Sequence, residues 1–226
     1  MSFFVGAILP FLTVALFVGG MAYRIRAWRK LPVPAMTLFP TPRSTGKRLL
    51  AVLKETFLLE RLFRGDRNLW LLGGLFHGML AVTLLAHYGK LLALAGLTRR
   101  AVLQVPLLSG GPAGIALMGC AVLLLLRRLI VRRVATISRT GDYVALLLVL
   151  AVVATGDALR YLHHVDVVRM RDYFSGLATF SYRGLPENPW FVVHFLLAQA
   201  LVIYIPFSKG IHVSGVFFTQ AAVHRH

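Results

Sequence analysis

The sequence predicts an all-α integral membrane protein, a bundle of five transmembrane helices, from three observations. The chain is 58% hydrophobic with a mean hydropathy of +0.73. Its apolar residues gather in uninterrupted runs, whereas a soluble domain is about half apolar and spreads these residues out. The longest runs match the roughly 20 residues that cross a hydrocarbon core of about 30 Å. We therefore expect one membrane domain over residues 1–226 and no soluble domain.

Charged residues mark the ends of five apolar runs. The first run has no positive segment before it and no clear small-residue cleavage site, so we expect a retained helix rather than a cleaved signal. The third and fourth runs are short, and we expect their helices to extend into flanking residues. The predicted spans are 2–23, 69–95, 113–126, 143–158 and 190–207.

The loop charges predict the orientation in the membrane. Segment 24–68 holds eleven Lys and Arg against three acids, and 127–142 holds five Arg against one acid. Segment 90–112 has three cations, and 157–189 has four Arg balanced by four acids. Cytoplasmic loops carry the excess of Lys and Arg. We therefore expect the N-terminus outside and the C-terminus inside, in a prokaryotic cytoplasmic (inner) membrane, and assign the net charge of +17 to topology rather than to nucleic-acid binding.

The first cytoplasmic loop divides into two parts. Residues 31–44 contain four prolines and are expected to be extended. Residues 46–63 place leucines and a phenylalanine on one helical face, which predicts a cytoplasmic amphipathic helix. Such a helix either lies on anionic lipid headgroups or docks a cytoplasmic partner, and the two roles are compatible.

Four histidines in two spans are the candidate site. His77 and His87 lie in the second span, and His194 and His212 lie in and just after the fifth. Polar side chains at membrane depth are costly and are functional by default. Because the two spans run in opposite directions, depth pairs His87 with His194 on the outer side and His77 with His212 on the inner side.

Helical geometry supports this pairing with one misfit. Ten residues from His77 to His87 rise about 15 Å, and eighteen from His194 to His212 complete about five turns, which puts the second pair on one face. Their rise would be about 27 Å, too long to match the first pair. Pro206 lies between them, and we expect it to kink or break the helix.

Two facing pairs of membrane histidines predict two haem groups, each iron held by one imidazole from each helix. The single cysteine, Cys120, excludes an iron–sulfur cluster within this chain. Arginine and lysine near the span ends are candidates for binding haem propionates. These are Arg160 on the outer side, and Lys209 with Arg24 or Arg26 on the inner side.

Two further groups of residues have alternative interpretations. Gly73, Gly74 and Gly78 flank His77 and suit either the close approach of a porphyrin edge or close packing of another helix. His163 and His164 are adjacent in the outer loop, so they cannot share one porphyrin face. We interpret them as surface or quinone-site residues.

The pattern resembles the gamma subunit of respiratory nitrate reductase. The resemblance rests on the five spans, on H-x9-H in the second and H-x17-H at the end of the fifth, and on the run PFSKGIH that ends at His212. Relatives of that subunit include the membrane subunits of the sulfite-reductase-associated complex and of heterodisulfide reductase.

The resemblance implies a dihaem cytochrome b that exchanges electrons between the membrane quinone pool, with menaquinone expected, and a cytoplasmic iron–sulfur subunit of an oxidoreductase complex. It leaves room for further membrane or periplasmic subunits and assigns no catalytic residue to this chain. In the nitrate reductase branch a lysine follows the outer ligand near the quinol. Lys90 is the candidate here, and Ala86 stands where that branch has glycine.

Two alternatives from other functional classes remain open. A transporter with a histidine relay would favour acids within the spans, and spans one, two, three and five contain none. A haem-free anchor would use its histidines for hydrogen bonds between helices.

Overall fold

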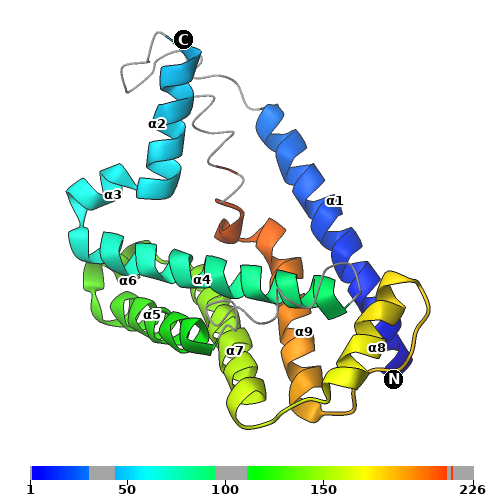
Figure 1. Ribbon diagram of the computed structural model, residues 1–226. Helices are drawn as coiled ribbons and strands as arrows, with labels where there is room; N and C mark the ends of the chain where they lie inside the picture. The colour runs from blue at the N-terminus through cyan, green and yellow to red at the C-terminus, as the bar shows by residue number, and fades with distance from the viewer. Residues whose placement is uncertain (1, 31–43, 95–110, 213–214, 216–226) are drawn as a thin grey trace.

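The structure is a computed structural model that describes residues 2–30, 44–94, 111–212 and 215. Within these residues all regular structure is helical, and five helices are long and apolar enough to cross a membrane (Figure 1). This confirms the predicted all-α fold with five membrane helices. The outside position of the N-terminus stays a prediction.

Several of the membrane helices extend beyond the apolar runs that predict them, whereas the fifth ends before the predicted residue 207. The third and fourth extend into charged flanks, as expected, because Arg and Lys side chains can reach the membrane surface from helix ends. A short π-helical stretch, η1 (Phe4–Ile8), opens the first span. The five helices are α1 (Leu9–Arg29), α4 (Arg67–Leu94), α5 (Gly111–Ile130), α7 (Thr140–Tyr161) and α9 (Pro189–Tyr204).

A break at Leu59 divides the predicted amphipathic helix 46–63 into α2 (Thr45–Leu58) and α3 (Glu60–Gly65). Leu59 has a left-handed backbone, with a φ of 49°. The break turns the chain back onto α4, where the Phe63 and Trp70 rings meet edge to face with centres 5.0 Å apart. The Trp70 indole N–H also donates to the last carbonyl of α2 at 2.6 Å. The prediction of one continuous helix is therefore wrong, because these contacts override the apolar periodicity.

Two short helices in the loops were not expected from the sequence, α6 (Arg132–Ile137) and α8 (Val167–Ala178). Tyr173 anchors α8, since its side chain is fully buried and its hydroxyl donates to the Gly6 carbonyl at 2.8 Å. Burial raises the pKa of Tyr173 above its ordinary value, so the phenol stays neutral. Apolar residues at 170, 173, 174 and 177 have helical spacing and were the available signal for α8.

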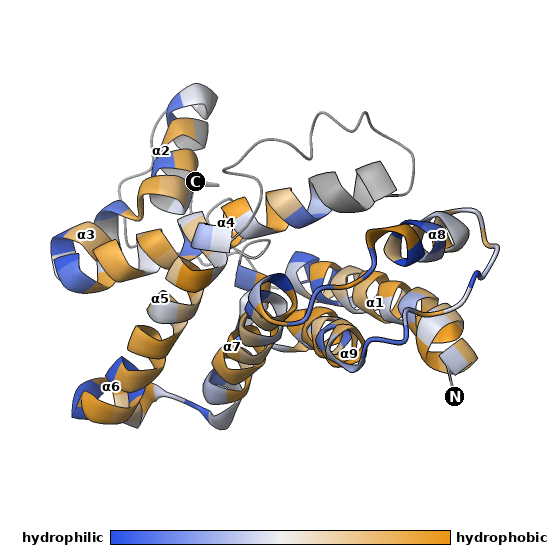
Figure 2. Ribbon diagram, turned by 60° about the horizontal axis from the view of Figure 1, so that its bottom comes forward, coloured by the Kyte–Doolittle hydropathy of each residue, from blue (hydrophilic) through white to orange (hydrophobic). Residues whose placement is uncertain are grey.

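The membrane helices pack in sequence, α4 on α5, α5 on α7, α7 on α9, and α9 on α1. In Figure 1, α4 crosses in front of α7 and α9, and Figure 2 shows apolar residues along the membrane helices. Thr13 of α1 donates a buried hydrogen bond of 3.0 Å to Gln199 of α9. Among the described residues α4 and α9 are not closely packed partners.

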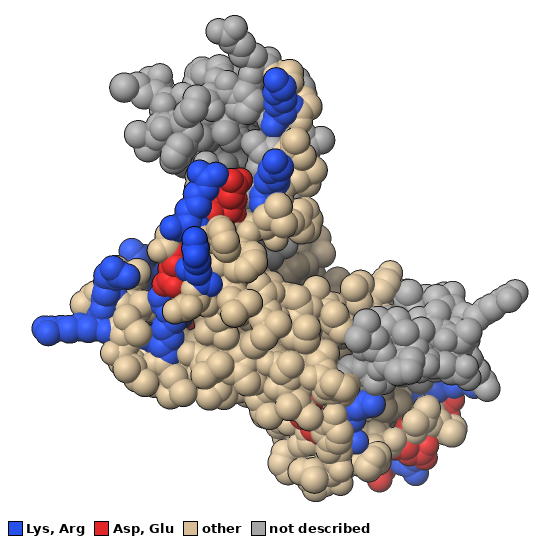
Figure 3. All heavy atoms as spheres, turned by 60° about the vertical axis from the view of Figure 1, so that its left-hand side comes forward, with Lys and Arg blue, Asp and Glu red and all other residues tan. Residues whose placement is uncertain are grey.

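Basic side chains gather on one side of the molecule, over α2, α3 and the end of α5 with α6 (Figure 3). Asp66 connects this region to the bundle. Its carboxylate accepts the N–H of Leu69 at 2.9 Å and pairs with Arg127 of α5 at 2.7 Å. The hydrogen bond from Leu69 and the charge of Arg127 hold the pKa of Asp66 below its ordinary value. This contact fixes the start of α4, the helix that carries two of the histidines.

Candidate metal centre

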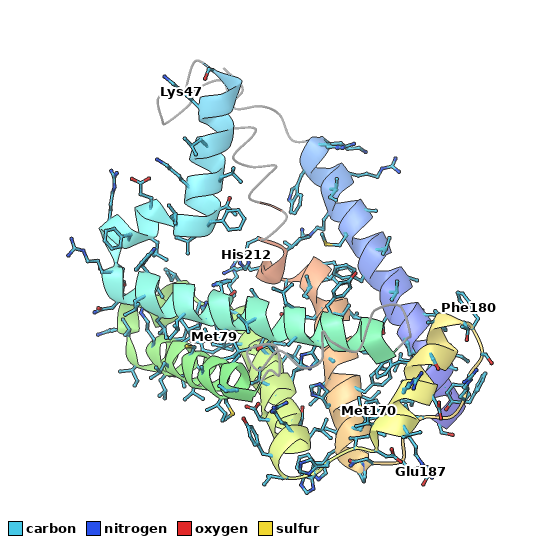
Figure 4. The ribbon with its side chains drawn as sticks, in the orientation of Figure 1. Lys47, Met79, Met170, Phe180, Glu187 and His212 are labelled. Carbon is cyan, nitrogen blue, oxygen red and sulfur yellow. The ribbon has the colours of Figure 1, made fainter. Side chains whose placement is uncertain are left out.

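Two pairs of imidazole rings face each other between α4 and the last span. The ring centres of His77 and His212 are 5.7 Å apart, with their planes at 88°. Those of His87 and His194 are 6.4 Å apart, with their planes at 32°. Figure 4 shows His212 at the end of the chain segment that follows α9, next to α4. The structure therefore brings together the same two pairs that the depth argument selects.

The α-helix of the last span ends before His212. After α9 come two 3₁₀ turns, η4 (Ile205–Phe207) and η5 (Lys209–Ile211), with an extended Ser208 between them. Pro206 lies in the first turn, where its missing N–H and its ring prevent the α-helix from continuing. The expected five full turns from His194 to His212 are therefore wrong. The break places His212, and it removes the rise of about 27 Å that a continuous helix would impose.

In all four histidines Nδ1 lies within hydrogen-bond distance of a backbone carbonyl. A carbonyl only accepts, so Nδ1 carries the proton and Nε2 keeps a free lone pair. Metal-ligating histidines are commonly held in this way, by a hydrogen bond from the ring nitrogen that does not bind the metal. The acceptors are Gly73 for His77 at 2.7 Å, Thr83 for His87 at 2.8 Å, Val152 for His194 at 3.1 Å and Lys209 for His212 at 2.9 Å.

The spacing of each pair fits two axial ligands of one metal. Two metal–imidazole bonds of about 2 Å on opposite faces place the ring centres about 6 Å apart. The observed separations of 5.7 and 6.4 Å lie on either side of that value. Within the described part of the chain no group of three or more His, Cys, Asp or Glu side chains could hold a metal. Pairs of imidazoles at this spacing therefore suit a haem better than a metal held by protein ligands alone.

Two residues of α7, Gly156 and Thr155, contact the His194 ring. A Cβ atom at Gly156 would lie 3.1 Å from Cε1 of the His194 ring, so the absence of a side chain lets the imidazole approach the α7 backbone. The hydroxyl of Thr155 lies 3.0 Å from Nδ1 of the same ring. Neither residue was expected from the sequence, because small residues are common wherever membrane helices pack closely.

The glycines beside His77 adjoin open space. A Cβ atom at Gly73, Gly74 or Gly78 would meet no heavy atom within 4 Å among the described residues. Close packing against another described helix is therefore not their role. The space next to the His77 ring is open on the α4 side, as the approach of a flat ring system requires.

Arg160 and Lys90 are the two other predicted cofactor-binding residues. The Arg160 guanidinium lies 5.9 Å from the ring centre of Tyr161 and packs near Gly111 at the start of α5. Lys90 belongs to α4, three residues after His87, and its side chain lies outside the described residues.

Two of the inner propionate candidates, Lys209 and Arg24, and the outer-loop residue His163 contact other groups of the chain. Lys209 Nζ lies 2.7 Å from the Asp142 carboxylate, and Arg24 Nε donates to the Pro206 carbonyl at 3.0 Å. These bonds stabilise the break after α9. The His163 ring stacks on Trp190 with centres 4.6 Å apart. Its interpretation as a surface or quinone-site residue stays a prediction.

Comparison with known proteins gives one family and two relatives. Residues 61–222 match the family described as nitrate reductase gamma subunit. The chain is 32% identical to a protein of Archaeoglobus fulgidus named Hdr-like menaquinol oxidoreductase cytochrome b-like subunit, over 95% of this chain and 77% of that protein. A protein of Archaeoglobus profundus with the same name is 27% identical, over 93% and 76% of the two chains.

Proposed function

Because this chain belongs to the nitrate reductase gamma subunit family, we propose that it is the dihaem cytochrome b subunit of a respiratory complex. His87 and His194 would hold the outer haem, and His77 and His212 the inner one. The observation that carries the proposal is the facing of two imidazole pairs, each ring with Nδ1 tied to a carbonyl and Nε2 left free.

A haem held by one imidazole from each of two helices would supply one-electron transfer. The chain contributes the spacing and the orientation. One helix, α4, carries a ligand of each site, and ten residues separate them by about 15 Å along its axis. Two sites at that spacing divide a hydrocarbon core of about 30 Å into short steps for an electron.

The electron donor or acceptor in the membrane is proposed to be menaquinone or menaquinol, because both named relatives are menaquinol oxidoreductase subunits. The family resemblance puts the quinol near the outer haem, where His87 and Lys90 lie on α4. Oxidation there would release protons outside, and the electrons would move inward. Moving one negative charge inward against a negative-inside potential costs about 2.3 kcal/mol per 100 mV. Turnover in this direction therefore generates membrane potential, and the reverse direction consumes it.

The partner is proposed to be a cytoplasmic iron–sulfur subunit that docks on the basic side formed by α2, α3 and α6. The Hdr-like name of both relatives favours the heterodisulfide-type branch over the nitrate-type branch. Cations spread over one side attract an acidic partner and increase its rate of association at low salt. The direction of electron flow follows from the partner's reduction potential.

The test is a reduced-minus-oxidised spectrum together with a pyridine haemochrome assay on the purified chain. We expect two b haems in the wild type. His77→Ala and His212→Ala should lose the same haem, and His87→Ala and His194→Ala should lose the other. His163→Ala is the matched control and should keep both, since its ring stacks on Trp190. A well-folded chain without haem would contradict the proposal and leave the haem-free anchor or the histidine-relay transporter.

A further inference from the structure

Asp142 is a buried carboxylate at the start of α7, a span that supplies no proposed haem ligand. Its side chain is only 6% exposed. One oxygen, Oδ2, accepts the backbone N–H of Arg139 at 3.0 Å and the ammonium of Lys209 at 2.7 Å. Arg128 of α5 also lies 3.7 Å from this oxygen. A charge removed from solvent requires such partners, and here they come from three separate segments of the chain.

Lys209 connects this carboxylate to His212. The ammonium of Lys209 binds Asp142, and the backbone carbonyl of the same residue accepts the Nδ1–H of His212 at 2.9 Å. Lys209 is the first residue of η5, and His212 directly follows that turn. The position of the turn therefore determines where the His212 ring lies and in which direction its Nε2 atom points.

Neighbouring hydrogen bonds hold the rest of the break. Tyr204 donates to the Gly141 carbonyl at 3.0 Å, and Arg24 donates to the Pro206 carbonyl at 3.0 Å. Both contacts lie before Ser208, so they fix the end of α9 and η4. The Asp142–Lys209 ion pair lies beyond Ser208 and ties η5 itself to α7.

We propose that Asp142, acting through Lys209, is a positioning residue for the inner haem ligand His212. The inference rests on the proposed function, since it assigns a role in holding the inner haem. The carboxylate fixes the Lys209 ammonium, and the Lys209 carbonyl fixes the protonated Nδ1 of His212. The His212 ring is thereby held beside the ring of His77, with the two ring centres 5.7 Å apart.

The test compares haem retention at the two sites in the full-length purified chain. The readout is the rate at which each b haem transfers to a haem-scavenging apoprotein, together with the low-spin iron signature of the haem that remains. Asp142→Asn removes the charge but keeps an oxygen that accepts the Arg139 N–H, and Lys209→Met removes the ammonium. Partners that orient a ligand typically change metal affinity by about 10–100-fold when they are lost. Each variant should therefore release the inner haem about 10–100-fold faster than the wild type.

The controls separate positioning from general stability. Lys209→Arg keeps a cation and should restore retention of the inner haem. Glu60→Gln removes a carboxylate of the same basic side that pairs with Arg64 of its own helix rather than with η5, and should leave both haems at the wild-type rate. The outer haem in each sample reports whether the bundle is folded.

Each outcome decides the question. Faster loss of the inner haem alone in Asp142→Asn and Lys209→Met, with rescue by Lys209→Arg, supports the proposal. Wild-type retention in both variants, or equal loss of both haems, overturns the positioning role while leaving the dihaem function intact. A folded wild-type chain that binds no haem overturns the proposed function and this inference with it.

Discussion

Gly156 of α7 and His194 of α9 are in direct contact, and the imidazole occupies the place next to the missing side chain. The ideal Cβ position at Gly156 is 3.1 Å from Cε1 and 3.6 Å from Nδ1 of the ring. The 3.1 Å distance is shorter than ordinary van der Waals contact, so a side chain at 156 must displace the His194 ring. The geometry of the proposed outer haem site therefore depends on a helix that supplies no ligand to it.

Gly156→Ala should weaken the outer haem site and leave the inner one unchanged. The added methyl group displaces the His194 ring by a few tenths of an ångström, and we expect roughly tenfold faster loss of the outer haem. Gly156→Val should have a larger effect. Haem transfer to a scavenging apoprotein measures the rate. Gly119→Ala is the matched control, because a Cβ there meets no described atom within 4 Å. Equal rates for Gly156→Val and Gly119→Ala would disprove the contact.

Thr155→Val should change the reduction potential of the outer haem without removing it. The hydroxyl lies 3.0 Å from Nδ1 of His194, next to the Val152 carbonyl at 3.1 Å from the same nitrogen. Losing one of two acceptors makes the imidazole a weaker electron donor to iron, so the outer haem should become easier to reduce. A potentiometric titration with Thr155→Ser as the conservative control tests this. An unchanged potential in Thr155→Val would show that the Val152 carbonyl alone suffices.

The spans and the histidine pairs could be predicted because both depend on properties local to one segment. The length of an apolar run reports whether a helix can cross a membrane. The direction of each span then orders its histidines from the inner to the outer side, and the structure brings together the pairs predicted from that order, His77 with His212 and His87 with His194.

The supporting residues could not be predicted because their roles depend on contacts between distant segments. Gly156 and Thr155 matter only because α7 packs on α9. The break at Leu59 follows from contacts of Trp70, eleven residues further along the chain. Lys209 could have served a haem propionate, but Asp142 lies next to it only in the folded bundle. Sequence spacing carries no information on any of these pairs.

Thr13 and Gln199 share a buried hydrogen bond, and replacing one partner should destabilise the protein more than replacing the other. Thr13→Val leaves the Gln199 amide buried with its oxygen unpaired, and its Nε2 already has no partner among the described residues. We expect a loss of about 1 kcal/mol in the free energy of unfolding. Gln199→Leu should cost less, because the Thr13 hydroxyl can bond to a carbonyl one turn earlier in its own helix.

The double variant Thr13→Val with Gln199→Leu distinguishes a hydrogen bond from simple packing. If the bond is responsible, replacing both partners should nearly restore the stability lost in Thr13→Val. Unfolding in detergent followed by circular dichroism gives the four free energies of the cycle. Additive losses in the double variant would show that the two side chains act independently.

Tyr173 should make the docking of α8 sensitive to alkaline pH. Burial raises the pKa of this phenol above its ordinary value, and the neighbouring Tyr182 adds to the effect. A raised pKa in the folded state means that the contribution to stability is fully present below about pH 10 and is lost as the pH rises further. Hydrogen exchange of α8 should therefore accelerate above that pH in the wild type.

Tyr173→Phe should reduce the protection of α8 at neutral pH by about 1 kcal/mol, because its hydrogen bond to Gly6 is lost. The variant should also show a flatter alkaline response. Tyr23→Phe, at a residue that is 69% exposed, should behave as the wild type. An alkaline loss of protection that persists in Tyr173→Phe would assign the titration to another group.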